Sequence, residues 1–408
     1  MKIKSILSSF SNETSPIRFH HLLFFIVAIV VTPSSGFWFD MQDRPQWIAY
    51  MLKNGLANAY GSGANYLPFG LEILYFYGLI KSLFYIPDAN FYFFKYFLLL
   101  FDFVVIISLL NAFRDKKYPW YFDLIVFLNI GYFHNTMFWG QQDAIHSGLV
   151  ILSLIAFVKE KPTLGATLIV LAINAKLQAI VFLPIIGLWW LYFALKNPRA
   201  IVQTLVALVL IQTLIFLPFI LGGTFSKIKE VVTTSVGFFP FVSWNAYNLW
   251  YLVLKSDPKL MNDATPFFHF TYKKWGLLLF MAFSALAIFP MIACFMKSFI
   301  KKSKNQADLG KIAFLVAGTV GLVFFFFNTQ MHERYTFPCI LLYFGYALMA
   351  RKYVLYFLIS LGYLLNVEAI YSYFHLNFVK PELVSLIFLA ALILSFFNIF
   401  LLTKKNLS

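Results

Sequence analysis

Five short polar clusters interrupt an otherwise apolar chain, and their residue types suit acid–base and phosphate chemistry. They are Asp40/Asp43, Trp139 to Asp143, Lys176/Gln178, Ser243 to Trp250 and His332 to Tyr335. A carboxylate at a water interface stays ionised and can accept a proton, so Asp40 is a candidate general base and Asp43 a second one. Arg334 presents a planar fork that fits phosphate oxygens, and His332 and Lys176 could donate further hydrogen bonds.

The remaining polar and aromatic residues of these clusters suit a sugar or an acceptor. Indole faces can stack on sugar C–H surfaces, and amides can bond hydroxyl groups. The candidates are Trp139, Gln141, Asp143, Gln178, Asn245, Asn248 and Glu333. Asp143 could equally cap a helix. With His146 it has a spacing compatible with metal ligation, although two ligands are a weak signal. A divalent ion held by Asp40 and Asp143 fits the residues without being required.

Each cluster also has a purely structural interpretation. Asp40 and Asp43 could be the N-cap and N3 residues of a surface helix. The tryptophans could anchor the chain at a membrane interface. Lys176 could extend to the surface, which would lower an insertion cost of about 3 kcal/mol. Glu333 and Arg334 could form an interfacial ion pair. The sequence alone leaves both interpretations open.

The composition defines the setting of these clusters. The 408 residues are 61% hydrophobic, 20% aromatic and 12% charged, which predicts a polytopic membrane protein. The net charge of +15 comes from short basic clusters between apolar runs, which is typical of cytoplasmic loops and argues against nucleic-acid binding. Cys294 and Cys339 lie in or beside apolar runs and offer neither a disulfide framework nor metal-ligand spacing.

The apolar runs predict an all-α fold with about twelve transmembrane helices in a single domain, residues 1–408. A spanning helix needs roughly 20 apolar residues. The candidate spans are 22–38, 91–113, 118–139, 144–158, 162–175, 177–195, 200–221, 275–296, 312–327, 336–350, 353–374 and 383–402. The short pair 144–158 and 162–175 could instead be a buried hairpin. Asp102 lies within the second span and is interpreted as a buried structural residue, with Lys95 as its partner.

Basic residues set the predicted orientation. Counting residues 68–85 as a full span would place Arg114, Lys116 and Lys117 outside the cell, against the preference of Lys and Arg for cytoplasmic loops. We therefore predict a re-entrant or membrane-associated helix there, within a large first external loop, 39–90. A second long external loop covers 222–274. Both termini are then cytoplasmic, and all five polar clusters face the exterior.

Taken in order, the clusters resemble the GT-C superfamily of membrane glycosyltransferases, in particular bacterial relatives of the mannosyltransferases and of the dolichol-pathway glucosyltransferases. Six blocks between Phe39 and Pro338 carry the resemblance: Asp40 with Trp47, Asn65-Tyr-Leu-Pro68, Trp139-Gly-Gln-Gln-Asp143, Lys176-Leu-Gln178, Asn245-Ala-Tyr-Asn-Leu-Trp250 and His332-Glu-Arg-Tyr335. Leu67 departs from the family pattern, which usually has a first proline at this position.

The resemblance implies a hexosyltransferase that moves a sugar, with mannose as the first expectation, from a polyprenyl-phosphate donor to a lipid-linked or glycan acceptor. It implies a catalytic acidic residue in the first external loop and a donor phosphate held near the external membrane face. The setting would be a bacterial inner membrane, with no required cofactor. Two other classes stay open: a polytopic lipid or polyol transporter, and a protein or oligosaccharide transferase of the same superfamily.

Overall fold

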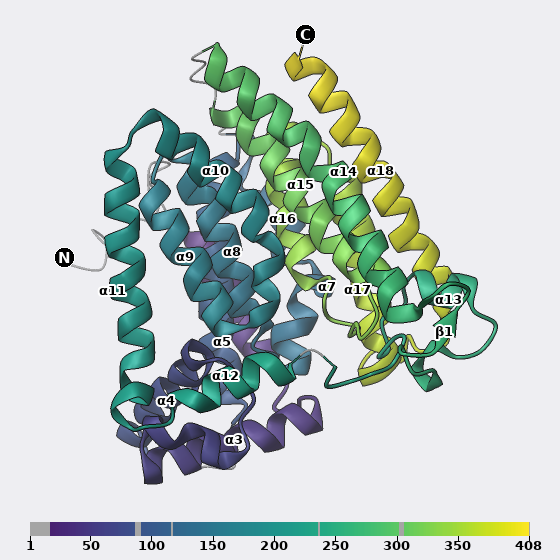
Figure 1. Ribbon diagram of the computed structural model, residues 1–408. Coiled ribbons are helices and arrows are strands. Elements are labelled where there is room, and N and C mark those ends of the chain that lie inside the picture. The colour runs from purple at the N-terminus through teal and green to yellow at the C-terminus, as the bar shows by residue number, and fades with distance from the viewer. Residues whose placement is uncertain (1–16, 86–90, 116, 236, 302–305, 408) are drawn as a thin grey trace.

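The computed structural model describes residues 17–85, 91–115, 117–235, 237–301 and 306–407, with backbone only for 38–40, 306 and 307. The described chain is predominantly helical, as its apolar composition predicts (Figure 1). Its two strands, β1 (Pro266–Phe267) and β2 (Phe270–Thr271), form a small antiparallel ribbon within the predicted second long loop.

Seven of the described helical segments have the length and apolar composition of a full membrane crossing. They are α5 (Phe93–Phe113), η4 with α10 (Leu177–Phe182 and Leu183–Lys196), α11 (Arg199–Leu221), α14 (Tyr272–Ile300), α15 (Gln306–Phe327), α17 (Val354–Tyr371) and α18 (Pro381–Leu407). The chain is therefore an all-α polytopic protein with membrane-spanning helices. Each of the seven corresponds to a predicted span.

Four further predicted spans are shorter apolar helices. They are α2 (Phe19–Val31), α8 (Asp143–Val158), α9 (Pro162–Ala175) and α16 (Phe337–Ala350). Their lengths of 13 to 16 residues fall below the roughly 17 residues of a typical crossing. Helices α8 and α9 pack against each other.

The prediction of a single helix over 118–139 is wrong. This segment is divided into η2 (Trp120–Asp123), α6 (Leu124–Phe127), α7 (Ile130–Phe133) and η3 (His134–Trp139), the last a π-helix. Asn129 interrupts the helix because its side chain accepts from the backbone N of Tyr132 at 2.9 Å and donates to Ser360 Oγ at 2.7 Å. Irregular backbone is tolerated at membrane depth only when protein surrounds it, and residues 131–137 are all buried.

Two residues of α5 anchor this broken segment. The Lys95 ammonium donates to the carbonyls of Met137 at 2.8 Å and Phe138 at 3.3 Å, and the buried carboxylate of Asp102 accepts from the Tyr132 hydroxyl at 2.5 Å. The predicted partnership between Lys95 and Asp102 is therefore wrong. Both residues bond to the segment that follows their helix, because its interrupted backbone and polar side chains supply buried groups that need partners.

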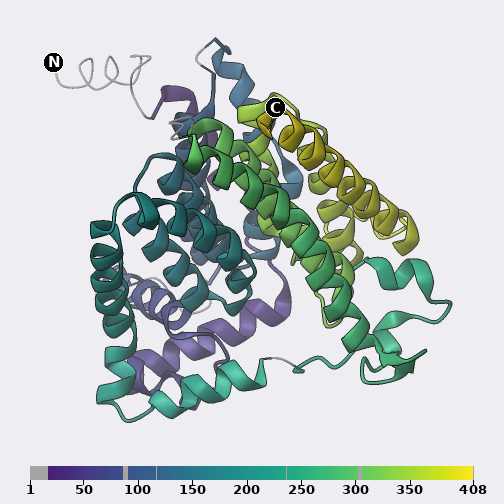
Figure 2. The same cartoon turned by 45° about the horizontal axis from the view of Figure 1, so that its top comes forward.

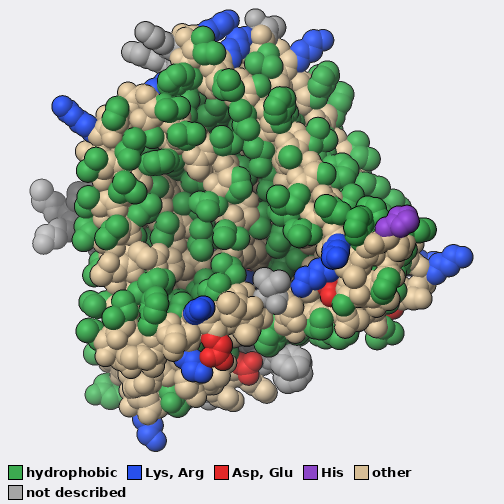
Figure 3. All heavy atoms as spheres, viewed as in Figure 1, with side chains coloured by type: hydrophobic (Ala, Val, Ile, Leu, Met, Phe, Trp, Pro, Cys, Tyr) green, Lys and Arg blue, Asp and Glu red, His purple; other side chains and the backbone are tan. Residues whose placement is uncertain are grey.

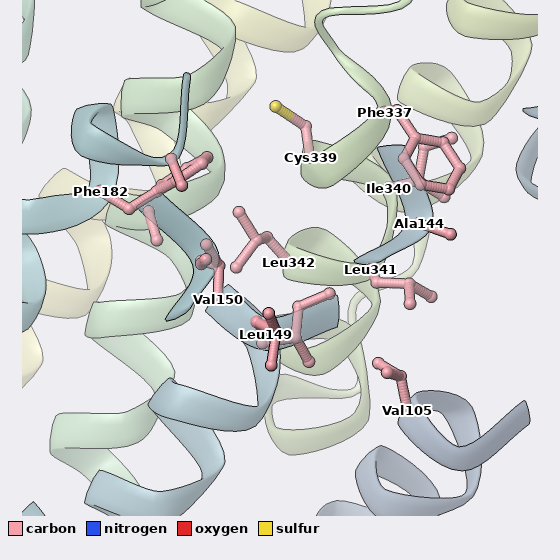
Figure 4. Packing of buried hydrophobic residues seen from close by; sticks show 14 of the residues in the cluster. Val105, Ala144, Leu149, Val150, Phe182, Phe337, Cys339, Ile340, Leu341 and Leu342 are labelled. Atoms are coloured by element: carbon pink, nitrogen blue, oxygen red, sulfur yellow. The ribbon is translucent and has the colours of Figure 1, made fainter. Parts of the chain in front are cut away.

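The core lies where α5, α8, η4 and α16 meet (Figure 4). Buried aliphatic side chains such as Val105, Leu149 and Leu341 fill this region. Gly148 permits the close approach of α5 and α8, because an added Cβ would lie 2.6 Å from a methyl group of Val105. Cys294 and Cys339 are both buried, and each is a free thiol.

The basic loops gather at one end of the bundle. Arg351 contacts Asp115, and Gly310 lies beside both Val158 and Met349, so loops far apart in sequence share this end. The chain terminus at the end of α18 lies there too (Figure 1). Hydrophobic side chains cover the middle of one face, and Lys and Arg are concentrated at its upper and lower margins (Figure 3). We call the end with these loops the basic end.

The opposite end holds the helices of the two long predicted loops. The first loop forms α3 (Trp38–Asn54), η1 (Leu56–Ser62) and α4 (Pro68–Leu83), and α4 occupies the segment predicted to be a re-entrant or membrane-associated helix. The second contains α12 (Phe225–Thr234), α13 (Leu249–Val253) and η5 (Pro258–Leu260). Helices α3, α4 and α12 lie together below the bundle (Figures 1 and 2).

Candidate functional site

The centre of the candidate site is Asp143, the first residue of α8. Its side chain is 3% exposed and lies between two cations. Lys176 Nζ contacts one carboxylate oxygen, and Arg334 Nε lies 3.4 Å from the other. Arg334 Nη1 also donates to Glu333 Oε1 at 2.8 Å. Three of the predicted clusters therefore meet here, although they are separated by up to 190 residues of sequence.

Local backbone features bring these side chains together. Lys176 is an extended residue between the end of α9 and the start of η4, so its side chain leaves the helical direction. Gly70 lets α4 approach this point, because an added Cβ would lie 2.8 Å from the Ala175 carbonyl oxygen. Gly140 has a φ of 83°, a left-handed conformation that favours glycine and ends the π-helix just before Asp143.

Aromatic rings cover the two cations. The Arg334 guanidinium carbon lies 5.9 Å from the centre of the Trp139 ring, and Lys176 Nζ lies 5.4 Å from that of Tyr335. Gln178 Nε2 donates to the Tyr335 carbonyl at 3.3 Å. These predicted residues share one site, and such cation–ring contacts help to hold a partly dehydrated cation.

Arg44 belongs to the site, and the sequence gave too weak a signal to find it. It is 1% exposed and donates to Gly140 O at 2.9 Å, to Gln141 Oε1 at 2.8 Å and to the Tyr66 hydroxyl at 3.0 Å. Burial lowers the pKa of Lys176 most, Asp143 opposes that effect, and Arg334 and then Arg44 lower the pKa further. The only sequence signal was an arginine beside Asp43 in a predicted loop, where charged residues are usually solvated.

The helix carrying Asp40 and Asp43 starts earlier than predicted. Helix α3 begins at Trp38 with Phe37 as its N-cap, so Asp40 is the N3 residue, and the alternative of an Asp40 N-cap with Asp43 at N3 does not hold. Asp43 is exposed, whereas the Asp40 side chain lies outside the described residues. The Phe37 backbone N donates to the Trp139 carbonyl at 3.0 Å. Asp40 and Arg44 are four residues apart and share a helix face.

His332 lies beside the cations as a neutral imidazole. Burial, and then the positive charges of Arg334 and Lys176, hold the pKa of His332 well below its usual value. Its backbone pairs with that of Trp244 and Asn245, which joins the second long loop to the site. His332 can therefore donate a hydrogen bond to an anion but adds no positive charge near pH 7.

The two asparagines of the second long loop differ in placement. Asn245 lies beside His332 through the backbone bridge, with a φ of 64°. Asn248 is fully buried and serves the fold: its Oδ1 accepts from Trp250 N at 3.2 Å, and its Nδ2 donates to the Phe325 carbonyl at 3.1 Å. Asn245 therefore lies near the site, whereas the Asn248 side chain caps the N-terminus of α13.

A small cavity adjoins Asp143 and Lys176. It is a narrow recess whose empty volume of about 210 Å³ includes space open to solvent, and Tyr66, Gln142 and His146 complete most of its wall. Among the described groups, His146 Nδ1 and Gln142 Oε1 are buried without a hydrogen-bond partner. The cavity therefore offers unused polar atoms next to the charged cluster, as a binding site for a polar ligand requires.

Within the described residues, the geometry gives little support to a bound cation. Both carboxylate oxygens of Asp143 already face positive groups. At the basic end, His20 and His21 place Nε2 atoms 2.9 and 3.1 Å from Asp123 Oδ2, a grouping of metal-ligand type. Arg114 Nε lies 2.8 Å from the other oxygen of that carboxylate, so a divalent cation would meet an anion that is already paired.

Comparisons with protein-family models and with curated proteins find no match to this chain. The resemblance to GT-C glycosyltransferases therefore rests on the six sequence blocks alone. Residues of all six blocks lie at the end of the bundle opposite the basic end.

Proposed function

We propose that this chain is a membrane glycosyltransferase that transfers a sugar, with mannose as the first candidate, from a polyprenyl-phosphate donor to a lipid-linked or glycan acceptor. The observation that carries the proposal is the cluster of charged side chains around the buried carboxylate of Asp143. Lys176 and Arg334 contact that carboxylate, Glu333 pairs with Arg334, and Arg44 bonds to Gln141 beside them. Ammonium and guanidinium groups gathered in this way suit the phosphate of a lipid-linked donor.

The position of the cluster supports a lipid-linked substrate. It lies where helices α8, η4 and α16 begin, at one end of an apolar bundle. A phosphate placed there would bond to charged donors while its polyprenyl chain stays in the membrane. Charge on the departing phosphate increases as the glycosidic bond breaks, so cations fixed near it would stabilise the transition state more than the bound donor. Arg334 and Lys176 have this role in the proposal.

The acceptor hydroxyl needs a base, and Asp40 has that role, with Asp43 second. Two contacts hold the backbone on either side of Asp40 against the site. Before it, the Phe37 N–H donates to the Trp139 carbonyl; after it, Arg44, one turn further along α3, donates to the Gly140 carbonyl. Asp43 is exposed and is the second candidate.

The test is a transfer assay on the purified protein with a panel of polyprenyl-phosphate sugars, with products weighed by mass spectrometry. We expect one sugar to be transferred. Asp40→Asn should lower turnover by about 100- to 10,000-fold, the usual contribution of a general base, while donor binding persists. Arg334→Ala should weaken donor binding by about 10- to 100-fold, which corresponds to the loss of a charged hydrogen bond.

Arg351→Ala is the matched control, because Arg351 is an exposed cation at the basic end. It should leave transfer unchanged. Arg334→Lys retains the charge and should restore part of the donor binding if the protein remains folded. If no donor of the panel is bound or transferred by the wild-type protein, the proposal fails. Donor uptake into sealed liposomes without product would favour a transporter.

A further inference from the structure

A second cavity lies at the basic end, and its lining carries three lysines from different elements. Lys311 comes from α15, Lys352 from the turn between α16 and α17, and Lys405 from the end of α18. The cavity is open to the surface, and its empty volume of about 610 Å³ includes space open to solvent. It is separate from the candidate site, because α15, α16 and α18 run the length of the bundle between them.

The polar wall of this cavity is fixed by hydrogen bonds. Lys352 Nζ donates to Asn398 Oδ1 at 3.2 Å, and the Tyr346 hydroxyl donates to the same oxygen at 3.3 Å. Asn398 is 6% exposed and Tyr346 2% exposed, so their positions are set by the packed helices. Lys311 pairs with Asp308 at 2.8 Å. The charged residues that line the cavity, among those described, are all lysines, so the lining suits an anion.

An apolar strip leads away from this cavity along α18. Leu401 lines the cavity, and Phe397 and Ile393 follow at intervals of four residues on the same helix face. Their side chains are 39%, 55% and 62% exposed, which is typical of a lipid-facing surface in a membrane protein. The strip is long enough to contact an acyl chain whose polar end lies at the lysines.

We propose that this cavity binds the headgroup phosphate of an anionic phospholipid, with an acyl chain along Leu401, Phe397 and Ile393. Lysines around a pocket between membrane helices are suited to a phosphate, because each ammonium donates several hydrogen bonds and attracts the negative surface of the leaflet. A soluble phosphate would use the same lysines but would leave the apolar strip without a partner. The lipid accounts for both features.

The test uses the purified full-length protein in phosphatidylcholine nanodiscs and measures its thermal midpoint as phosphatidylglycerol is added. A lipid that binds only the folded protein raises the midpoint. The variant Lys352→Gln/Lys405→Gln should raise the half-saturating phosphatidylglycerol fraction about 25-fold, at about fivefold for each lysine. Each single variant should show about a fivefold change, so the prediction stays testable if the double variant unfolds.

The matched control is Lys404→Gln/Lys159→Gln, which removes two exposed lysines near the same end that do not line the cavity. It should bind phosphatidylglycerol as the wild-type protein does. Equal losses in both double variants would show a general charge effect and overturn the proposal. A midpoint rise with inorganic phosphate alone would identify a soluble anion as the ligand and would also overturn it.

Discussion

Asp143 and Asp308 each pair with a lysine, at opposite ends of the bundle and at very different depths. The Asp143 side chain is 3% exposed and has two cationic neighbours, whereas that of Asp308 is 37% exposed and pairs with a lysine one turn away. Burying a charge is costly unless its partners are present, while an exposed pair gains little over hydration. The same pair of residue types therefore surrounds a buried carboxylate at one end and forms a partly exposed ion pair at the other.

The largest expected effect comes from removing the buried anion. Asp143→Ala leaves Lys176 and Arg334 without their shared carboxylate, and we expect a loss of about 3–5 kcal/mol in the free energy of unfolding. Thermal unfolding in detergent micelles would measure it. The double variant Asp143→Ala/Lys176→Met should recover part of the loss, because it also removes an unpaired cation. No recovery would mean that the two side chains are not energetically coupled.

A smaller effect is expected at Glu368, which supports the site end from α17. Its carboxylate lies 2.6 Å from His134 Nε2 and accepts from the backbone N of Phe374 at 2.7 Å. Glu368→Gln should cost about 1–3 kcal/mol, because it leaves buried donors imperfectly satisfied. Limited proteolysis near residues 372–380 would reveal the loosened loop. The exposed Glu382→Gln is the control and should leave cleavage unchanged.

The effect of His332 on the pH dependence of the free energy of unfolding should be next in size. Burial, with Arg334 and Lys176, lowers its folded pKa, so below about pH 6.5 the unfolded chain binds a proton that the folded chain does not. Stability should therefore fall as pH drops from about 6.5 to 5, by at most about 1.4 kcal/mol per pH unit. His332→Gln should reduce this slope in unfolding experiments. An unchanged slope would assign the pH dependence to other groups.

The smallest effect is expected for the exposed pair. Asp308→Asn should change the free energy of unfolding by no more than about 1 kcal/mol, because water and salt screen this pair. The difference should disappear in about 1 M salt, where the screening length is roughly 3 Å. A loss as large as that of Asp143→Ala would remove the distinction between the two ends.

Much of the fold could be predicted from the length of the apolar runs, and the span prediction that failed did so for a physical reason. Eleven predicted spans correspond to helices because an apolar face of helical length has few alternatives in a membrane. The prediction of one helix over 118–139 failed because hydropathy does not show that Asn129 and His134 bond to α17, more than 200 residues later. Hydropathy detects burial but not the partner.

The candidate site was predictable where charged residues interrupt apolar runs. Lys176, Asp143 and Arg334 stood out because a charge at the end of an apolar run needs an explanation, and they lie together. Arg44 did not stand out, because it lies in a polar stretch where an arginine is ordinary. Asn248 was misleading for the opposite reason: an amide beside tryptophans suits a sugar and suits a helix cap equally well.

The contacts between the broken segment and α17 constrain the order in which the chain can be assembled. Asn129, His134 and Asn135 find their partners on α17, at Ser360, Glu368 and Tyr363. During synthesis, residues 118–139 emerge long before α17 exists. Their polar groups must remain hydrated, or held by the insertion machinery, until the last third of the chain arrives. Trp139 and Asp143 would then reach their final positions only near the end of biogenesis.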